Sequence, residues 1–327
     1  MTTGRFAYDA DEAQVLASYN PKVAFGEAMG RIAREDELLS IVVSDYGRRL
    51  SLDEALAVRP EALVQCGIAE QSQVEVSCAL ANEGFHVFAP AYAPFITARV
   101  LDQVRVNLGM MRSPAVLVGI SAGLESGMLG ASHMAVEDIA HMRSIPNVEV
   151  ICPADNAELV CVLRQLAVDP VPAYVRVTCP DVGSSAHPKG GCFQRGRAEV
   201  LWGDPADADV ALVATGSIVC RAIEAVQLLD ARGVRACVVE MGTIKPLDTA
   251  MLEGLFGCRL VVTVEEHSVV GGLGGAVAEY LAGVGGAPRL LRLGTPDAYL
   301  AADYAAALLE RAGLTPQAMA DAVFAAL

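Results

Sequence analysis

Short apolar runs alternate with amphipathic stretches of helical length along almost the whole of this 327-residue chain. In the first half, five apolar runs predict strands, over residues 38–44, 86–89, 115–120, 148–152 and 173–177. Between them, periodic segments predict helices, over residues 23–34, 71–82, 96–108, 136–143 and 157–168. Because helices connect parallel strands and cover both faces of their sheet, this alternation predicts an α/β fold with a mostly parallel sheet.

A segment rich in Gly, Pro and Ser, residues 178–196, interrupts this alternation and is the best linker in the sequence. A second α/β pattern follows, with strands predicted over 209–214, 234–240 and 260–264 and a helix over 218–232. The length and the 53% hydrophobic composition suffice for two cores. We therefore predict two domains, each a mostly parallel sheet flanked by helices, and four segments: an N-terminal extension 1–19, a first domain 20–177, a linker 178–196 and a second domain 197–327.

The net charge and the cysteine pattern limit which partners this protein can bind and in which cellular compartment it works. Lys and Arg number 24 against 39 Asp and Glu, which gives a net charge of −15. An acidic surface repels phosphate backbones, so we expect no nucleic-acid partner. The nine cysteines form no CxxC pair, which favours free thiols in a reducing cytoplasm. Charges or glycines break every apolar run before it reaches the roughly 18 residues of a membrane span, so we expect a soluble cytoplasmic protein without a membrane partner.

One carboxylate is expected where a strand ends and a helix begins. The run Gly67-Ile68-Ala69-Glu70-Gln71 follows the apolar pair Leu63-Val64 and opens the predicted helix 71–82. The first turn of a helix favours a negative charge, and α/β sheets bind ligands at the carboxyl ends of their strands. Taken alone, Glu70 is better explained as an ordinary surface carboxylate in the first turn of a helix.

Three further motifs follow this run in order, Tyr92-Ala93-Pro94-Phe95, Asp102-Gln103 and Gly130-Ala131-Ser132-His133. Together the four resemble the pyrimidine-binding region of the transketolase family of thiamine diphosphate enzymes, which includes the deoxyxylulose phosphate synthases. The later phrase EEHSVVGGLGG, residues 265–275, resembles the C-terminal domain of the same family. The resemblance covers nearly all of residues 20–327, and it implies that the first domain is the pyrimidine-binding domain.

The resemblance implies a binding site for the cofactor's aminopyrimidine ring. Glu70 would bond the ring nitrogen and favour the imino tautomer, which lets the cofactor form its ylid. Tyr92 and Phe95 would hold the ring by stacking, although core packing is the alternative for both. Asp45 and Ile68 complete the candidate cofactor contacts.

His133 matches a family histidine that faces the substrate near the reacting carbon. A neutral imidazole there can donate to a developing alkoxide, which makes His133 the second candidate catalytic residue. The alternative is a hydrogen-bonded loop histidine.

The candidate substrate contacts depart from the pattern of members that act on ketose phosphates. Leu129 stands where those members carry an aspartate, Ser121 where they carry a histidine, and Met134 replaces a glutamine. Arg176 matches an arginine that grips a substrate phosphate, and Lys22 stands where another such arginine is expected. The resemblance implies that anion recognition persists in a changed donor pocket, which would favour a smaller donor such as pyruvate.

The family's anchor for Mg²⁺ and the diphosphate, a Gly-Asp-Gly followed by an asparagine, does not occur in this sequence. Gly203-Asp204 is followed by Pro205. The resemblance therefore implies one subunit of a split transketolase, with no metal site of its own. A separate diphosphate-binding chain would supply the Mg²⁺ site in an α2β2 assembly that transfers a two-carbon ketol or acyl unit. The alternatives are the β subunit of a 2-oxo-acid dehydrogenase, which also carries GIAEQ, and a non-catalytic assembly partner.

Overall fold

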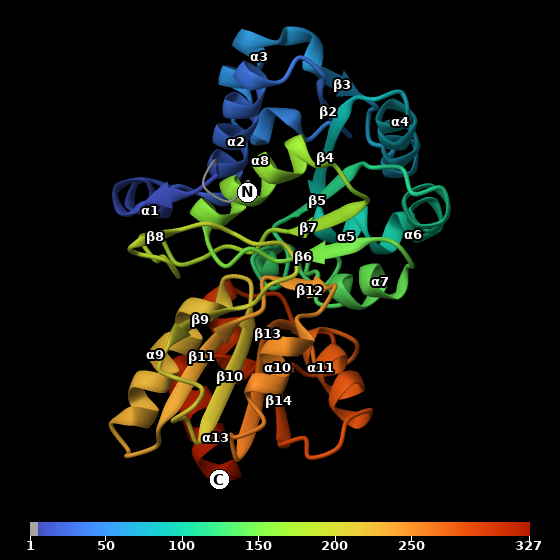
Figure 1. Cartoon of the computed structure of the whole chain (residues 1–327). Coiled ribbons are helices and arrows are strands. Elements are labelled where there is room, and N and C mark those ends of the chain that lie inside the picture. The colour runs from blue at the N-terminus through green and yellow to red at the C-terminus, as the bar shows by residue number, and fades with distance from the viewer. Residues whose placement is uncertain (1–5) are drawn as a thin grey trace.

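Two open β-sheets, one above the other in Figure 1, organise the computed structural model, which describes residues 6–327. The first sheet has the strand order β12-β6-β7-β5-β4-β2-β3, and only β12 runs antiparallel to its neighbour. Its strands are β2 (Leu39–Val43), β3 (Leu63–Gln65), β4 (His86–Tyr92), β5 (Val116–Ile120), β6 (Glu149–Ile151), β7 (Ala173–Arg176) and β12 (Thr243–Lys245).

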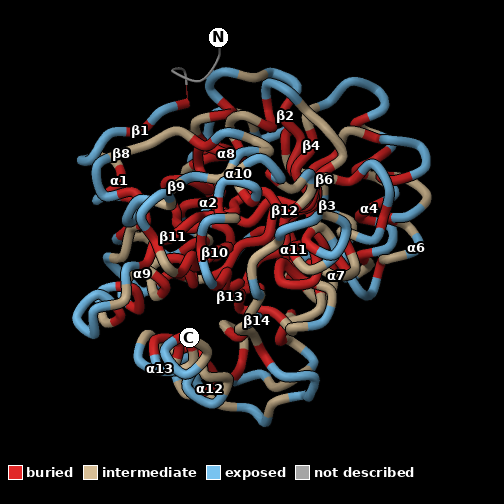
Figure 2. The backbone as a smooth tube through the Cα atoms, turned by 60° about the horizontal axis from the view of Figure 1, so that its bottom comes forward, coloured by how far each residue is buried: buried red, intermediate tan, exposed pale blue. Residues whose placement is uncertain are grey.

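The second sheet has the order β14-β13-β10-β11-β9, and here only β9 is antiparallel to its neighbour. Its strands are β9 (Glu199–Trp202), β10 (Val210–Thr215), β11 (Ala236–Glu240), β13 (Leu260–Ser268) and β14 (Arg289–Thr295). Every residue of β2, β5 and β10 is buried, and Figure 2 shows the buried strands inside a mostly exposed rim of helices and loops. The predicted architecture of two mostly parallel sheets flanked by helices is confirmed.

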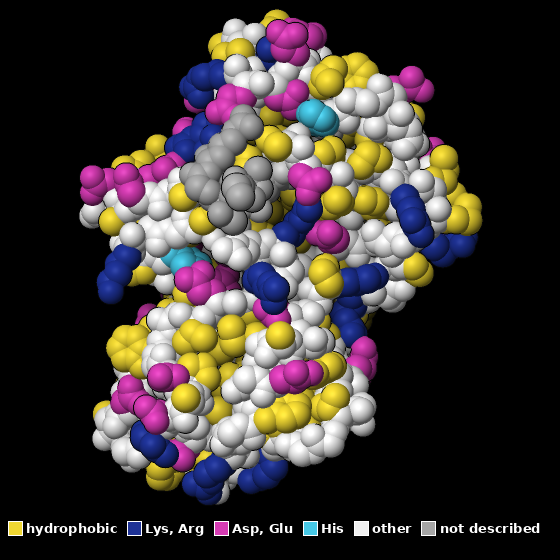
Figure 3. Space-filling view, viewed as in Figure 1, with side chains coloured by type: hydrophobic (Ala, Val, Ile, Leu, Met, Phe, Trp, Pro, Cys, Tyr) yellow, Lys and Arg dark blue, Asp and Glu magenta, His cyan; other side chains and the backbone are white. Residues whose placement is uncertain are grey.

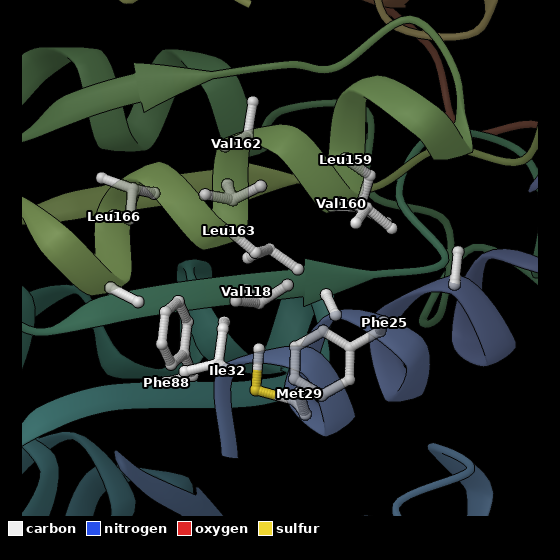
Figure 4. Packing of buried hydrophobic residues seen from close by; sticks show 14 of the residues in the cluster. Phe25, Met29, Ile32, Phe88, Val118, Leu159, Val160, Val162, Leu163 and Leu166 are labelled. Carbon is white, nitrogen blue, oxygen red and sulfur yellow. The ribbon is translucent and has the colours of Figure 1, made fainter. Parts of the chain in front are cut away.

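Helices cover both faces of the first sheet. On one face, α2 and α8 pack against the strands through Phe25, Met29 and Leu163, as Figure 4 shows. Asn20 caps α2 by accepting from the Lys22 amide, and Pro21 occupies its first turn. The helices of this domain are α1 (Ala10–Ala17), α2 (Pro21–Glu35), α3 (Asp53–Val58), α4 (Glu70–Asn82), α5 (Ala93–Ile96), α6 (Leu101–Gln103), α7 (Asp138–Ser144) and α8 (Asn156–Val168).

The second sheet carries helices α9 (Ile218–Asp230), α10 (Thr249–Gly254), α11 (Leu273–Ala282), α12 (Ala305–Arg311) and α13 (Pro316–Ala326). One buried hydrophobic cluster contains residues of both halves, for example Leu117 of β5 and Val239 of β11. Strand β12 belongs to the second half of the chain but pairs with β6 of the first sheet. The two predicted domains therefore share a core and a sheet edge.

The predicted helix over residues 96–108 is wrong, because the structure breaks this segment at Thr97. The α5 helix ends at Ile96, and Thr97 adopts φ −122° and ψ −83°. Its hydroxyl donates to the Ala93 carbonyl at 2.6 Å, a local bond that competes with helix continuation. A 3-10 turn (Ala98–Val100), α6 and a π-helical turn (Val104–Met110) follow.

The predicted N-terminal extension and linker both lie against the first domain. Within the extension, whose first five residues are outside the described range, β1 (Tyr8–Asp9) pairs with β8 (Gly190–Gly191) of the linker. Phe6, Tyr8 and Leu16 are buried in the same hydrophobic cluster as α8. Burial of these apolar side chains holds the extension against the first domain. The mostly polar composition of the extension and the linker gives no sign of this packing. Residues 6–327 contain no helix that is long and apolar enough to cross a membrane.

Candidate active site

The Glu70 carboxylate lies at the carboxyl edge of the first sheet, where the sequence pattern predicts it. After β3 the chain turns at Gly67, whose φ of +70° falls in the left-handed region, and α4 then begins at Glu70. Glu70 is only 5% exposed, whereas Ile68 in the same turn is 77% exposed. No side chain caps this helix at Ala69, so the partial positive charge of the helix terminus acts on Glu70.

Three aromatic rings from separate elements meet beside this edge. Tyr92 ends β4, Phe95 lies in α5, and His133 follows the Gly130 turn, whose φ is +83°. The His133 ring contacts Tyr92 and Phe95 edge-on, with ring centroids 5.6 and 5.1 Å apart, and Tyr92 and Phe95 lie 6.0 Å apart. The structure thus brings together Tyr92, Phe95 and His133, three of the predicted site residues.

Arg99 joins Glu70 to this aromatic group, and the sequence patterns give no indication of it. Its Nη1 donates to Glu70 Oε2 at 2.9 Å. Its guanidinium also lies over the Phe95 ring, with Cζ 3.9 Å from the ring centroid. The break at Thr97 allows this placement, since it displaces Arg99 from the continuous helix that the periodicity predicts.

Tyr46 and Arg49 extend the group on the far side of Tyr92. The rings of Tyr46 and Tyr92 lie 4.8 Å apart, and Arg49 Nη1 donates to the Tyr92 hydroxyl at 3.3 Å. Asp45, a predicted cofactor contact, is exposed and adopts φ +59° next to Tyr46. The turn after β2 therefore supports the aromatic group through Tyr46 and Arg49.

A hollow of about 360 Å³ opens next to the aromatic group. It is lined by both halves of the chain: Pro94, Phe95, Ala98, Arg99, Ala131, Ser132, Met134, Glu137 and Tyr299. Phe95 is the one predicted site residue in this lining, and the neighbours of His133 in its loop, Ser132 and Met134, also line the hollow.

Arg176 is separated from solvent, in contrast to its predicted role in gripping a substrate anion. The residue is 1% exposed, and its Nε donates to Asp138 Oδ2 at 2.8 Å. Its Nη2 donates to the Ala135 and Glu266 carbonyls at 3.0 and 2.9 Å. Because Asp138 neutralises the guanidinium and backbone carbonyls accept from it, Arg176 ties the first domain to β13 of the second.

Lys22 forms an ion pair with Glu125, a residue that the sequence patterns did not single out. Lys22 Nζ lies 3.8 Å from Glu125 Oε1, and Ser121 is 1% exposed. Burial raises the pKa of Glu125, while Lys22 and Ser121 oppose this rise. Leu129, the remaining predicted substrate contact, lies in the loop before Gly130 and is 55% exposed. The predicted substrate residues therefore form no single group in this chain.

Comparison with known proteins assigns both domains. Residues 18–183 match the family described as "Transketolase, pyrimidine binding domain", and residues 197–319 match "Transketolase, C-terminal domain". A protein of Methanocaldococcus jannaschii called "Putative transketolase C-terminal section" is 33% identical over 300 residues, covering 91% of this chain and 93% of its own. This chain belongs to the transketolase family.

Two further relatives and a solved structure agree with this assignment. One of the subunits of an apulose-4-phosphate transketolase from Phocaeicola vulgatus is 34% identical, covering 79% of this chain and 82% of its own. A structure described as "Split gene transketolase, inactive beta4 tetramer" superposes with a TM-score of 0.80 at 33% sequence identity. The match covers 95% of this chain and 98% of the chain in that structure. The 1-deoxy-D-xylulose-5-phosphate synthase of Caldanaerobacter subterraneus is 29% identical over 98% of this chain but only 50% of its own.

Membership of the transketolase family implies thiamine diphosphate, and the observed groups fit its aminopyrimidine ring. The ring needs a flat apolar contact and a carboxylate that accepts at a ring nitrogen. Phe95 and Glu70 provide both, and the Arg99 guanidinium, itself planar and rich in N–H donors, already makes both contacts here. A planar ring with an N–H donor can therefore be held between Glu70 and Phe95.

Proposed function

We propose that this chain is one subunit of a two-chain transketolase-like enzyme that transfers a two-carbon ketol or acyl unit to an acceptor. A separate chain would supply the site for the diphosphate and Mg²⁺. The observation that carries the proposal is the buried Glu70 carboxylate at the carboxyl edge of a parallel sheet, joined to the Phe95 ring by the Arg99 guanidinium. Thiamine diphosphate, when bound, supplies a carbanion at its thiazolium carbon.

The residues of this chain have distinct parts in the proposed reaction. Glu70 shares a proton with the ring nitrogen of the aminopyrimidine, and Tyr92 and Phe95 orient the ring. The Arg99 side chain leaves Glu70 when the aminopyrimidine ring binds, because the ring and the guanidinium both require contact with Glu70 and Phe95. His133, which contacts Phe95 edge-on, donates to the oxygen that becomes negative on the substrate. Exclusion of water by the partner chain strengthens these interactions.

The proposed partner is a diphosphate-binding transketolase subunit, in an α2β2 assembly in the cytoplasm. Exposed apolar side chains support a large subunit interface, since Ile68, Met110, Met128 and Leu129 are each more than half exposed. The names of two relatives, one a "section" and the other one of several subunits, also support a split enzyme. The small-molecule substrates would enter between the two chains.

We predict that the reconstituted enzyme prefers pyruvate to ketose phosphates as donor. Leu129 and Ser121 replace two groups that would bond donor hydroxyls, and each lost charge-assisted hydrogen bond is worth about 1.5–3 kcal/mol. Two such losses shift the preference by roughly 10² to 10⁴. Measuring kcat/KM for xylulose 5-phosphate, fructose 6-phosphate and pyruvate shows which donor the reconstituted enzyme prefers. A clear preference for either ketose phosphate would disprove the assignment of the donor.

A further inference from the structure

Three buried metal-ligating side chains meet where the two domains join. Glu158 comes from α8, His187 from the linker segment and Glu240 from the end of β11. One ligand atom of each lies within 4.8 Å of the others, and His187 Nε2 is 3.1 Å from Glu240 Oε2. Their exposed fractions are 4%, 7% and 2%. On the face shown in Figure 3, a histidine and acidic side chains lie at the notch between the two halves.

Hydrogen bonds within the described chain leave part of this cluster unsatisfied. Glu240 Oε1 is buried and has no hydrogen-bond partner, whereas Glu240 Oε2 has only the ion pair with His187 Nε2 at 3.1 Å. His187 Nδ1 is also buried without a hydrogen bond, and its nearest acidic atom is Asp155 Oδ2 at 3.9 Å. Glu158 Oε2 accepts from the Ala154 amide at 2.6 Å, so its other oxygen is left for a further partner. Buried polar atoms without partners are rare in folded proteins, and two adjacent buried carboxylates repel each other.

We propose that Glu158, His187 and Glu240 bind one divalent transition-metal ion, best Zn²⁺, which fastens the second domain to the first. Zn²⁺ takes imidazole nitrogen and carboxylate oxygen at about 2.0–2.2 Å, and its fourth position accepts a water. Two carboxylates balance the charge of one dication, so the loaded site is neutral in a buried setting. This site is separate from the Mg²⁺ that the partner chain would hold.

Two features around the cluster provide room for the ion. Gly242 faces it: a Cβ at that position would lie 2.9 Å from the Phe193 ring and 3.3 Å from Glu240 Oε1, so a larger residue would crowd the ring and this ligand. A hollow of about 340 Å³ adjoins the cluster, with Glu158, Glu199 and Glu240 among its lining residues. This hollow gives the ion an entry path and admits the water ligand.

Burial and neighbouring charges shift the pKa values of the residues in the cluster. Burial and the neighbouring Glu240 raise the pKa of Glu158 well above its usual value. Burial lowers the pKa of His187, but the surrounding carboxylates outweigh it and raise the pKa overall. The other titratable groups that face the cluster are Tyr8, Asp155, Glu199 and Cys220.

Calorimetry on the full-length chain, stripped with a chelator, tests the site directly with Zn²⁺ as the probe. We expect one ion per chain with a Kd on the order of 1 μM or below. Mg²⁺ should bind at least about 10²-fold more weakly, because it disfavours imidazole. The melting temperature should rise with Zn²⁺ in the same preparation.

Glu240→Gln and His187→Gln should each weaken Zn²⁺ binding by about 10² or more, since each removes a ligand. Glu199→Gln is the matched control, because this largely exposed carboxylate lies 3.5 Å from the same His187 Nε2 without belonging to the cluster, and its loss should stay within about tenfold. Absence of saturable Zn²⁺ binding by the wild-type chain overturns the site, whether or not any variant folds. Unchanged binding by folded Glu240→Gln overturns it equally.

Discussion

Glu70→Gln should abolish turnover by the reconstituted two-chain enzyme while leaving the fold and the assembly of this chain intact. An amide of the same shape fills the same space at the start of α4 but cannot share a proton with the aminopyrimidine nitrogen. The loss should be about 10² or more in rate, the range for removal of a positioned acid–base group. Steady-state rates and the exchange of the thiazolium C2 proton, followed by NMR, measure it.

Arg99→Ala is the matched control for this variant. It removes the group that bonds Glu70 in the structure but keeps the carboxylate. Because the Arg99 side chain is 41% exposed, its ion pair is worth about 1 kcal/mol or less, and activity should change by no more than about fivefold. Near-full activity or C2 exchange in Glu70→Gln would show that Glu70 does not activate the cofactor.

Arg176→Met should lower the free energy of unfolding by about 3–5 kcal/mol, the largest stability effect that we expect of any single substitution in this chain. Methionine fills a similar volume, but it leaves Asp138 buried without its cation and two backbone carbonyls without their donor. Urea unfolding followed by circular dichroism at neutral pH gives the difference.

The pH dependence separates this electrostatic effect from a packing defect. Burial raises the pKa of Asp138, but Arg176 outweighs it and holds the pKa below its usual value. In the wild type, Asp138 therefore contributes stability that is lost as the pH falls through the carboxyl range. In Arg176→Met burial dominates and raises this pKa, so protonation relieves the penalty as the pH falls.

The deficit of Arg176→Met should consequently shrink between about pH 7 and about pH 5. Adding Asp138→Asn to the same chain should recover most of the lost stability at neutral pH, because it removes the unpaired charge. A deficit that is independent of pH, or a double variant that is no more stable than the single one, would contradict the electrostatic explanation.

The position of Glu70 between a strand end and a helix start was predictable from the sequence pattern, whereas Tyr92, Phe95 and His133 were expected beside it only because their motifs resemble the transketolase family. The strand before Gly67 and the strand that ends at Tyr92 are both visible as apolar runs. Their order along the chain therefore places their carboxyl ends together, with the helix that starts at Glu70 beside them. Continuous burial of β5 and β10 likewise appears in the sequence as nearly continuous apolar residues, with Gly119 inside β5 and Thr215 at the end of β10 as the exceptions.

Contacts between distant segments were not predictable in the same way. The helical period over 96–108 gives no sign that Thr97 bonds the Ala93 carbonyl or that Arg99 reaches Glu70. Arg176 ends a strand in the position of a substrate ligand, yet the partner that buries it, Asp138, lies in α7. Such pairs form only after the sheet has brought them together, and no local pattern encodes them.

Calorimetric titration of the isolated chain with thiamine diphosphate and Mg²⁺ tests the central claim, that the chain holds only the pyrimidine half of a transketolase-type site. The sequence lacks the Gly-Asp-Gly anchor, so the isolated chain should show no binding tighter than about 1 mM. Addition of the diphosphate-binding chain should restore binding by several orders of magnitude, together with turnover. Micromolar binding by the isolated chain would contradict the claim.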